Sequence, residues 1–188
     1  MKILVCGGAG FIGTNLVKEL LRGENQVYIV DNLSTGRLSN IQDLINDERV
    51  SFFEYDIVDG LPKAIDNVKF DQIYNFASPA SPPYIVKHQI ETIKTNIYGV
   101  HNLLDRAVRD GARFLQSSTS EVYGSALQTP QKETYWGNVN PNGPRASYDE
   151  SKRCAEALIY AYQREMNADV RIVRIFNTYG EYMKPEDG

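Results

Sequence analysis

Cysteine and histidine are scarce in this chain of 188 residues, which holds only two of each. Cys6 lies in an apolar run and Cys154 in an expected helix, far apart in the sequence, so we expect reduced packing residues rather than a redox or metal-ligand pair. His88 and His101 have neither a cysteine nor a pair of carboxylates beside them. The sequence therefore predicts no metal site.

Long apolar runs and an excess of basic charge are missing as well. No run of about 18 apolar residues occurs, and the apolar start MKILV leads into a glycine cluster with no small-residue cleavage site. We therefore expect a cytoplasmic protein without a membrane partner. The net charge is -4, and acidic and basic residues are interspersed, so no basic stripe can neutralise a phosphate backbone. Nucleic acid is not an expected partner.

The chain does contain short apolar runs bounded by Gly, Asp or Asn. They predict buried strands at residues 2–6, 26–30, 50–55, 72–76, 113–116 and 170–175. Apolar residues between 90 and 108 step by three and four, which predicts a helix that Gly111 terminates. Another helix is expected to begin at Ser147, with Glu150 completing a capping box. The expected apolar face of this helix comprises Ala155, Leu158, Ile159, Tyr162 and Met166.

Strands and helices alternate from the first residue. This order predicts an α/β fold, a Rossmann-like, doubly wound parallel sheet with helices on both faces. A chain of 188 residues that is 42% hydrophobic can bury one full core, so we expect one domain over residues 1–188. The irregular segment 135–146, YWGNVNPNGPRA, has two interpretations: it borders a pocket, or it is a surface connection anchored by Trp136.

A glycine-rich segment, GGAGFIG at residues 7–13, follows the first predicted strand and opens the first helix. Gly7, Gly10 and Gly13 fall where a tight turn, the approach of a pyrophosphate and helix–strand packing each exclude a side chain. Asp31 closes the second strand, where its carboxylate can accept hydrogen bonds from both ribose hydroxyls. Because a carboxylate repels a 2′-phosphate, the pattern favours NAD over NADP.

Tyr148 and Lys152 are one helical turn apart, so both side chains emerge on the same face near the start of their helix. A nearby ammonium and an oxidised nicotinamide both favour phenolate, which makes Tyr148 the candidate base for a substrate hydroxyl. Residues 117–120 end the fifth strand at the edge where parallel sheets bind ligands, and Thr119 there can hydrogen-bond the reacting oxygen. Glu121 follows directly and discriminates between possible reactions.

The chain's family resemblance is carried by the segments GGAGFIG, DNLSTGR, FASPASPPY, TIKTN, STSEVYG, YWGNVNPNGPR, YDESK and RIFNTYG. Together they resemble the UDP-glucuronate decarboxylases, the UDP-xylose synthases of the extended short-chain dehydrogenase/reductase superfamily. The match runs from Lys2 to about Gly180. Most of these motifs belong to the whole superfamily, but ASPASPP, STSEVYG and NVNPNGPR are more specific.

The resemblance implies a set of site residues. The NAD-binding residues would be Gly7, Gly10, Phe11, Ile12, Gly13, Asp31, Asn32, Thr35, Gly36, Asp56, Ile57, Phe76, Ala77, Thr95, Ser117, Tyr148 and Lys152. Of these, Asp56 and Ile57 would surround the adenine. The catalytic residues would be Tyr148, Lys152, Thr119 and Glu121. The substrate, a nucleotide sugar, would meet Lys94, Thr119, Glu121 and Asn177.

The reaction of this family, by resemblance, begins with oxidation of UDP-glucuronate at carbon 4. Tyr148 takes the proton and NAD the hydride, which creates a ketone beta to the carbon 6 carboxylate. Carbon dioxide then leaves, and return of the hydride gives UDP-xylose. Family members generally form homodimers through the helices at residues 90–108 and 148–166, so we expect a homodimer here.

Other activities stay open at the same residues. A nucleotide-sugar 4,6-dehydratase usually carries Asp-Glu where this chain has Ser120 and Glu121, and Ser120 is a poor proton donor. A 4-epimerase needs only the Tyr, Lys and Thr set, which leaves Glu121 without a clear task. A third alternative is an NAD-binding chain without turnover.

Departures from the family pattern bear on that third alternative. The family's chains normally continue well past Gly188, so we expect the C-terminal substrate domain to be absent or truncated. Glu181 and Tyr182 replace the usual Pro-Arg, and Ser125 replaces the usual Asp. The first change lies at the end of the substrate pocket that the resemblance implies.

Overall fold

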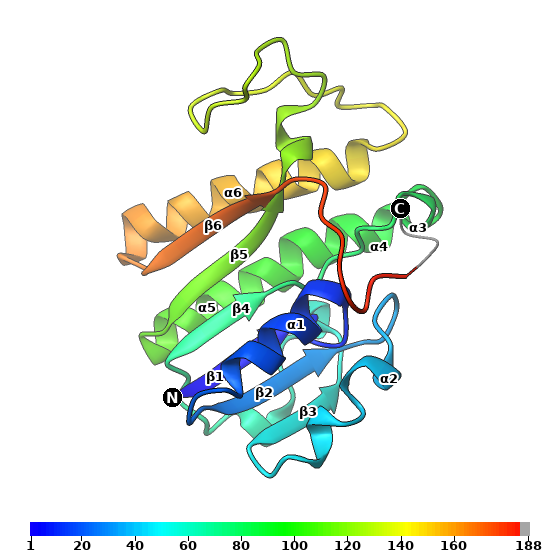
Figure 1. Ribbon diagram of the computed structural model, residues 1–188. Coiled ribbons are helices and arrows are strands. Elements are labelled where there is room, and N and C mark those ends of the chain that lie inside the picture. Colours follow the sequence, from blue (N-terminus) through cyan, green and yellow to red (C-terminus); the bar gives the residue numbers. More distant parts are fainter. Residues whose placement is uncertain (185–188) are drawn as a thin grey trace.

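A single parallel sheet forms the centre of the computed structural model, which describes residues 1–184 (Figure 1). Its spatial order is β3-β2-β1-β4-β5-β6, and every neighbouring pair is parallel. The strands are β1 (Lys2–Cys6), β2 (Gln26–Asp31), β3 (Val50–Glu54), β4 (Gln72–Asn75), β5 (Arg113–Thr119) and β6 (Val170–Ile175). This is the doubly wound order, and the predicted fold class is confirmed.

Helices cover both faces of the sheet (Figure 1). They are α1 (Phe11–Leu20), α2 (Leu38–Ile41), α3 (Pro82–Lys87), α4 (Gln89–Lys94), α5 (Val100–Asp110) and α6 (Ala146–Met166), with a π-helical turn at Thr95–Gly99. Short 3-10 turns lie at Leu44–Asn46, Ile57–Asp59, Lys63–Ile65 and Ser120–Tyr123. Alternate residues of β1 belong to different cores: Ile3 packs with Val17 of α1, and Leu4 packs with Leu104 of α5. Side chains alternate across a strand, so these cores lie on opposite faces.

The helix predicted over residues 90–108 is interrupted. The π-helical turn Thr95–Gly99 separates α4 from α5, and a side chain at Gly99 would meet Ile57 Cδ1 at 2.4 Å. A π turn adds a residue, so it rotates the two ends of the apolar stripe relative to each other. Val100 is therefore buried, whereas Ile90 is 73% exposed. Gly111 ends α5 in the left-handed region, with φ of 67°, as predicted.

The expected capping box at Ser147 is wrong. The helix α6 begins at Ala146 with Arg145 as the N-cap residue, so Ser147 lies in the first turn, buried and with no hydrogen-bond partner for its hydroxyl. The expected apolar face is correct for Ala155 and Ile159, which are buried, but Met166 near the end of the helix is exposed. Met166 lies in the last turn of α6, whose C-cap residue Asn167 is in the left-handed region, and Figure 1 shows the helix running alongside the edge strand β6.

Two other expected packing residues also turn out to be exposed. Cys6 is buried, but Cys154 is exposed on α6. Trp136 is 88% exposed, so it does not anchor the loop before α6. That loop is instead held by Tyr135, which stacks on Tyr123, and by an isolated bridge between Gly124 and Asn138.

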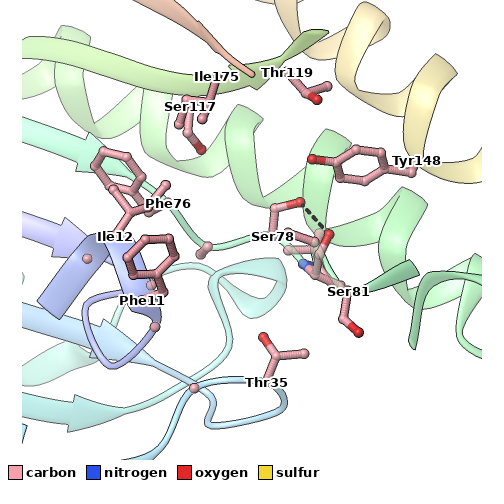
Figure 2. Close-up of a pocket in the computed structure, with 18 of the residues that line it drawn as sticks. Phe11, Ile12, Thr35, Phe76, Ser78, Ser81, Ser117, Thr119, Tyr148 and Ile175 are labelled. Atoms are coloured by element: carbon pink, nitrogen blue, oxygen red, sulfur yellow. Dashed lines mark hydrogen bonds between the residues drawn. The ribbon is translucent and has the colours of Figure 1, made fainter. Parts of the chain in front are cut away.

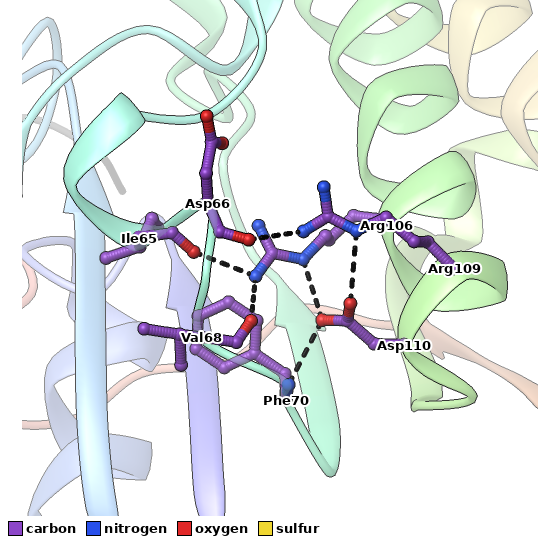
Figure 3. Close-up of polar contacts among 7 residues, drawn as sticks. All are labelled: Ile65, Asp66, Val68, Phe70, Arg106, Arg109 and Asp110. Atoms are coloured by element: carbon purple, nitrogen blue, oxygen red, sulfur yellow. Dashed lines mark hydrogen bonds and ion pairs between the residues drawn. The ribbon is translucent and has the colours of Figure 1, made fainter.

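A buried ion pair fixes α5 near the amino ends of the strands (Figure 3). The Arg106 Nε donates to Asp110 Oδ2 at 2.7 Å, and both side chains are buried. The Arg106 guanidinium also donates to the carbonyls of Ile65 and Val68, while the Phe70 N–H donates to Asp110 at 3.0 Å. The Arg109 Nε donates to the other Asp110 oxygen at 3.2 Å, so both carboxylate oxygens have partners, as a buried charge requires.

Candidate active site

A cavity of about 390 Å³ lies outside the carboxyl ends of the strands (Figure 2). It opens where β1 and β4 meet, the point at which the strand order reverses. Open parallel sheets bind ligands at this switch point, because the loops from neighbouring strands diverge to opposite faces there. The cavity has the glycine-rich loop at one end and Tyr148 at the other.

The glycine-rich loop leaves no room for side chains. Gly7 has φ of 77°, and a Cβ on it would meet the backbone carbon of Phe76 at 2.4 Å. A Cβ on Gly13 would meet the carbonyl oxygen of Gly7 at 2.1 Å. The backbone is thus tightly folded where α1 begins, and residues of the first helical turn, Phe11, Ile12 and Gly13, line the cavity. The N–H groups of a first helical turn have no partner within the helix. Such a cradle suits a pyrophosphate.

Asp31 stands at the end of β2, beside the glycine-rich loop. Its carboxylate oxygens accept hydrogen bonds from the N–H groups of Ala9 and Leu33, both at 2.9 Å. Burial raises the pKa of the Asp31 carboxyl, and the two backbone donors partly oppose this shift. A Cβ on Gly36 would approach Asp31 Oδ1 to 2.9 Å, so the loop after β2 packs closely around this carboxylate.

A second polar contact lies farther along the same wall. The Asn32 side-chain amide donates to Asp56 Oδ2 at 2.9 Å, and the Val58 N–H donates to Asp56 Oδ1 at 2.8 Å. These bonds join the ends of β2 and β3. The wall at this end is therefore rigid and polar where an adenosine is expected.

Lys152 and Tyr148 lie at the other end, on consecutive turns of α6. Lys152 is 2% exposed, and its ammonium donates to the carbonyl oxygen of Ser117 at 2.9 Å. Burial lowers the pKa of Lys152 to about 7, and the charge of Glu156 opposes this shift. Tyr148 is also buried, and its hydroxyl points into the cavity on the side where Ser117 and Thr119 lie (Figure 2).

Burial is the largest influence on the Tyr148 phenol and raises its pKa, while the Thr119 hydroxyl lowers it in part. The chain's own groups therefore do not deliver the expected lowering. The sequence suggested two charges that would lower the pKa of Tyr148, the Lys152 ammonium and an oxidised nicotinamide. The nicotinamide is the one that remains.

Glu121 follows the end of β5 and meets a residue that the sequence did not single out. Arg145 Nη2 lies 3.3 Å from Glu121 Oε2, and both side chains line the cavity. The Glu121 N–H donates to Thr119 Oγ1 at 3.2 Å. Asp149, one turn along from Arg145, has a pKa of about 6, raised by burial and by the charge of Glu121.

The cavity brings together almost all the residues implied by the family resemblance. Of the residues implied for substrate binding, Lys94 is the exception: it is exposed at the end of α4 and does not line the cavity. Its assignment, like those of the others, stays a prediction. The lining residues Gly7, Gly10, Phe11, Ile12, Gly13, Asp31, Asn32, Thr35, Gly36, Asp56, Ile57, Phe76, Ala77, Thr95, Ser117, Thr119, Glu121, Tyr148, Lys152 and Asn177 were all singled out from the sequence.

Sequence reasoning missed other residues of the cavity wall. Tyr55 and Met183 had no motif to mark them, and Ser78 and Ser81 lie in the FASPASPPY segment without an assigned role. Arg145 could have been noticed as the last charged residue before the Tyr148 helix. Among the described residues, no group of three or more His, Cys, Asp or Glu side chains could hold a metal ion, and no helix is long and apolar enough to cross a membrane.

Comparisons with known proteins agree with this geometry. Residues 4–187 match the family described as GDP-mannose 4,6 dehydratase. UDP-glucuronic acid decarboxylase 1 of Arabidopsis thaliana is 48% identical over 188 residues, which cover 100% of this chain and 42% of the relative. UDP-glucuronic acid decarboxylase 1 of Danio rerio is also 48% identical, over 100% of this chain and 44% of the relative. The chain thus spans less than half the length of these relatives.

Solved structures resemble the fold over nearly the whole chain. UDP-glucose 4-epimerase of Thermotoga maritima, with UDP-glucose, has a TM-score of 0.88 at 30% identity and matches 100% of this chain and 60% of its own. A dTDP-glucose 4,6-dehydratase of Streptomyces venezuelae, with NAD bound, has a TM-score of 0.86 at 34% identity and matches 99% of this chain and 59% of its own. The chain belongs to the GDP-mannose 4,6-dehydratase family of extended short-chain dehydrogenases, and it is a homologue of the UDP-glucuronic acid decarboxylases.

Proposed function

We propose that this chain is the NAD-binding part of an enzyme that converts UDP-glucuronate to UDP-xylose. One observation carries the proposal: Tyr148, Thr119, Glu121 and Lys152 line one end of the cavity whose other end is the glycine-rich loop. This arrangement occurs in a chain 48% identical to UDP-glucuronic acid decarboxylases. A nucleotide sugar is therefore the proposed substrate.

NAD fits the cavity on the chain's own geometry. The backbone around Gly7 and Gly13 is too close for any side chain and so leaves the N–H groups of α1 accessible to a pyrophosphate. Each Asp31 oxygen accepts one backbone hydrogen bond and keeps a lone pair for a ribose hydroxyl. When bound, NAD accepts a hydride from carbon 4 of the sugar and later returns it.

The chain's residues would manage the protons. Tyr148, as phenolate, takes the proton of the carbon 4 hydroxyl, and Thr119 holds that oxygen. The resulting ketone is beta to the carboxylate, so the electrons of the bond between carbons 5 and 6 pass into an enolate as carbon dioxide leaves. Carbon 5 then gains a proton, and Tyr148 returns a proton to the carbon 4 oxygen as the ketone is reduced. Glu121 lines the same end of the cavity, and its proposed role is to hold the ring or handle these protons.

The shortness of the chain supports one alternative, an NAD-binding unit without turnover. The chain covers 42% and 44% of the two decarboxylases compared above. Dehydration is less well supported, because Ser120 stands where an acid would be needed to protonate a leaving hydroxyl.

Incubation of the 188-residue chain with NAD and UDP-glucuronate tests the proposal. Nucleotide sugars are followed by NMR, and reduced cofactor by absorbance. UDP-xylose without net NADH is the expected result. A parallel incubation with dTDP-glucose, which carries a hydroxyl at carbon 6, tests the dehydratase, because a 4-keto-6-deoxy product can form only from such a sugar. Conversion of UDP-glucuronate to UDP-galacturonate would indicate the epimerase. NAD binding with no product would leave the cofactor-binding unit as the function of this chain.

A homodimer is proposed as well, through α4, α5 and α6. Three exposed apolar or aromatic residues lie there: Ile90 on α4, Tyr98 on the π-helical turn between α4 and α5, and Tyr160 on α6. Burying them between two chains would remove apolar surface from water. Light scattering of the purified chain at increasing concentration is the measurement, and a mass of one chain throughout would contradict the proposal. The cytoplasmic location stays a prediction.

A further inference from the structure

Arg145 has hydrogen-bonding capacity that its surroundings do not use. It is the N-cap residue of α6, and it contributes to the cavity wall at the end that holds Tyr148. Its Nη2 meets Glu121 at 3.3 Å, but its buried Nε has no hydrogen-bond partner. A buried donor without a partner is costly, so one expects a ligand or a rearrangement to satisfy it.

The cavity offers few other cations. Among the described residues that line it, Lys152 and Arg145 are the only Lys or Arg side chains. Lys152 is engaged by the carbonyl oxygen of Ser117 and is almost fully buried. Arg145 is therefore the cation that remains accessible to an anionic group of a substrate.

The ion pair with Glu121 can be exchanged. The side chains of Arg145 and Glu121 are 41% and 34% exposed, and a pair this open to water contributes little to stability. Its presence matters for a different reason. Glu121 alone would repel an anionic sugar beside Tyr148, and Asp149 adds to this repulsion, since its pKa near 6 leaves it mostly charged at neutral pH. A cation is needed between these carboxylates and an acidic substrate.

We propose that Arg145 binds the carboxylate of a hexuronate and so selects acidic over neutral nucleotide sugars. The inference rests on the proposed function, because it assigns a role within the same site. A planar guanidinium can meet both oxygens of a carboxylate, whereas a neutral hexose offers only a hydroxyl at carbon 6.

Calorimetric titration of the NAD-loaded 188-residue chain tests this role. UDP-glucuronate and UDP-glucose are compared, because they differ only at carbon 6. The variants are Arg145→Gln, Arg145→Lys, which keeps the charge, and Arg164→Gln, which removes an exposed arginine from the same helix. Circular dichroism and NAD affinity check that each variant folds.

The wild-type chain should prefer UDP-glucuronate. Arg145→Gln loses a hydrogen-bonded charge, so its affinity for UDP-glucuronate should be about 10- to 100-fold weaker than that of the wild type. Its affinity for UDP-glucose should change less than about threefold. The affinity of Arg145→Lys for UDP-glucuronate should lie between those of the wild type and Arg145→Gln. Arg164→Gln should behave as wild type. Equal losses for both sugars, no preference in the wild type, or no binding of either sugar would overturn the inference.

Turnover separates this inference from the proposed function. Selective binding that depends on Arg145, with no UDP-xylose formed, would support the carboxylate site and reject the decarboxylase. Formation of UDP-xylose, with unchanged sugar preference in Arg145→Gln, would support the decarboxylase and reject the carboxylate site at Arg145.

Discussion

The Lys152 ammonium lies 5.7 Å from the centre of the Tyr148 ring. The two residues are one turn apart on α6, and Ser117 at the end of β5 holds the ammonium in place through its carbonyl oxygen. This buried charge is expensive, which is why the pKa of Lys152 falls to about 7. The Tyr148 end of the cavity is thus built at some cost to the stability of the chain.

That cost predicts a stabilising but inactivating substitution. Lys152→Met removes the buried charge, so its free energy of unfolding should exceed that of the wild type at pH 6. Above pH 7 the folded wild type loses the proton while the unfolded chain keeps it up to a pKa of about 10, so wild-type stability rises with pH relative to the variant. The gap, which is the free energy of unfolding of Lys152→Met minus that of the wild type, should narrow by about 1–3 kcal/mol between pH 6 and pH 9.

Urea denaturation at both pH values measures this gap. Lys87→Met, at an exposed position, serves as the control and should show no such change between the two values. A gap that stays constant or widens toward pH 9 would show that Lys152 is not buried as a charge.

Tyr148→Phe should abolish proton transfer without altering cofactor binding. Loss of a general base costs about 100- to 10,000-fold in rate, whereas the buried ring still fills its place. The measurements are turnover of UDP-glucuronate and NAD affinity. Tyr160→Phe, which alters an exposed tyrosine of the same helix, should retain full activity. Retention of more than about a tenth of the activity by Tyr148→Phe would remove it as the base.

Gly13→Ala should break the cofactor cradle. Its new Cβ would lie 2.1 Å from the carbonyl oxygen of Gly7, and a backbone atom cannot simply rotate away. We expect a loss of about 1–3 kcal/mol in stability and at least tenfold in NAD affinity. Gly23→Ala is the matched control, because its Cβ would lie 3.2 Å from the end of the Asn25 side chain and 3.7 Å from the Leu20 carbonyl oxygen, an ordinary contact distance. NAD binding by Gly13→Ala at wild-type affinity would contradict the assignment of this loop to the cofactor.

Asp31→Ser should reduce the preference for NAD over NADP. The uncharged serine hydroxyl does not repel a 2′-phosphate. Serine also lacks the two carboxylate oxygens that accept hydrogen bonds from the N–H groups of Ala9 and Leu33 and that would accept them from the ribose. NAD affinity should fall about tenfold while NADP affinity holds or rises. Because the pKa of Asp31 is raised, wild-type NAD binding should weaken on acidification sooner than with an ordinary aspartate. Titrations with both dinucleotides measure these effects.

Arg106→Met should destabilise the fold but spare the cavity. It leaves the buried Asp110 with only the half-exposed Arg109, at 3.2 Å, as an ion-pair partner, and breaking a buried pair costs up to about 3–5 kcal/mol. Adding Asp110→Leu removes the stranded charge, so the double variant should recover at least half of the loss, as seen by denaturation. NAD affinity of folded protein at low temperature should be unchanged, because the pair lies at the opposite ends of the strands from the cavity. A double variant no more stable than the single one would disprove the argument.

The sequence alone determined the features that depend on neighbours along the chain. Alternating strands and helices predicted the doubly wound sheet, because side-chain periodicity is set by local backbone geometry. The glycine-rich loop and the single turn between Tyr148 and Lys152 were readable for the same reason. The apolar run 113–116 marked only the first part of β5, and the polar residues 117–119, expected at the end of that strand, also pair with β6.

Tertiary structure decided what depends on burial and on contacts between distant segments. Arg145 meets Glu121 only because the loop before α6 folds back over the end of β5. The raised pKa of Tyr148 and the lowered pKa of Lys152 follow from desolvation, which no spacing in the sequence reveals. Lys94 lies outside the cavity wall for a related reason: the side of a helix that faces a site is fixed by packing against the other elements, and packing is not encoded in any single motif.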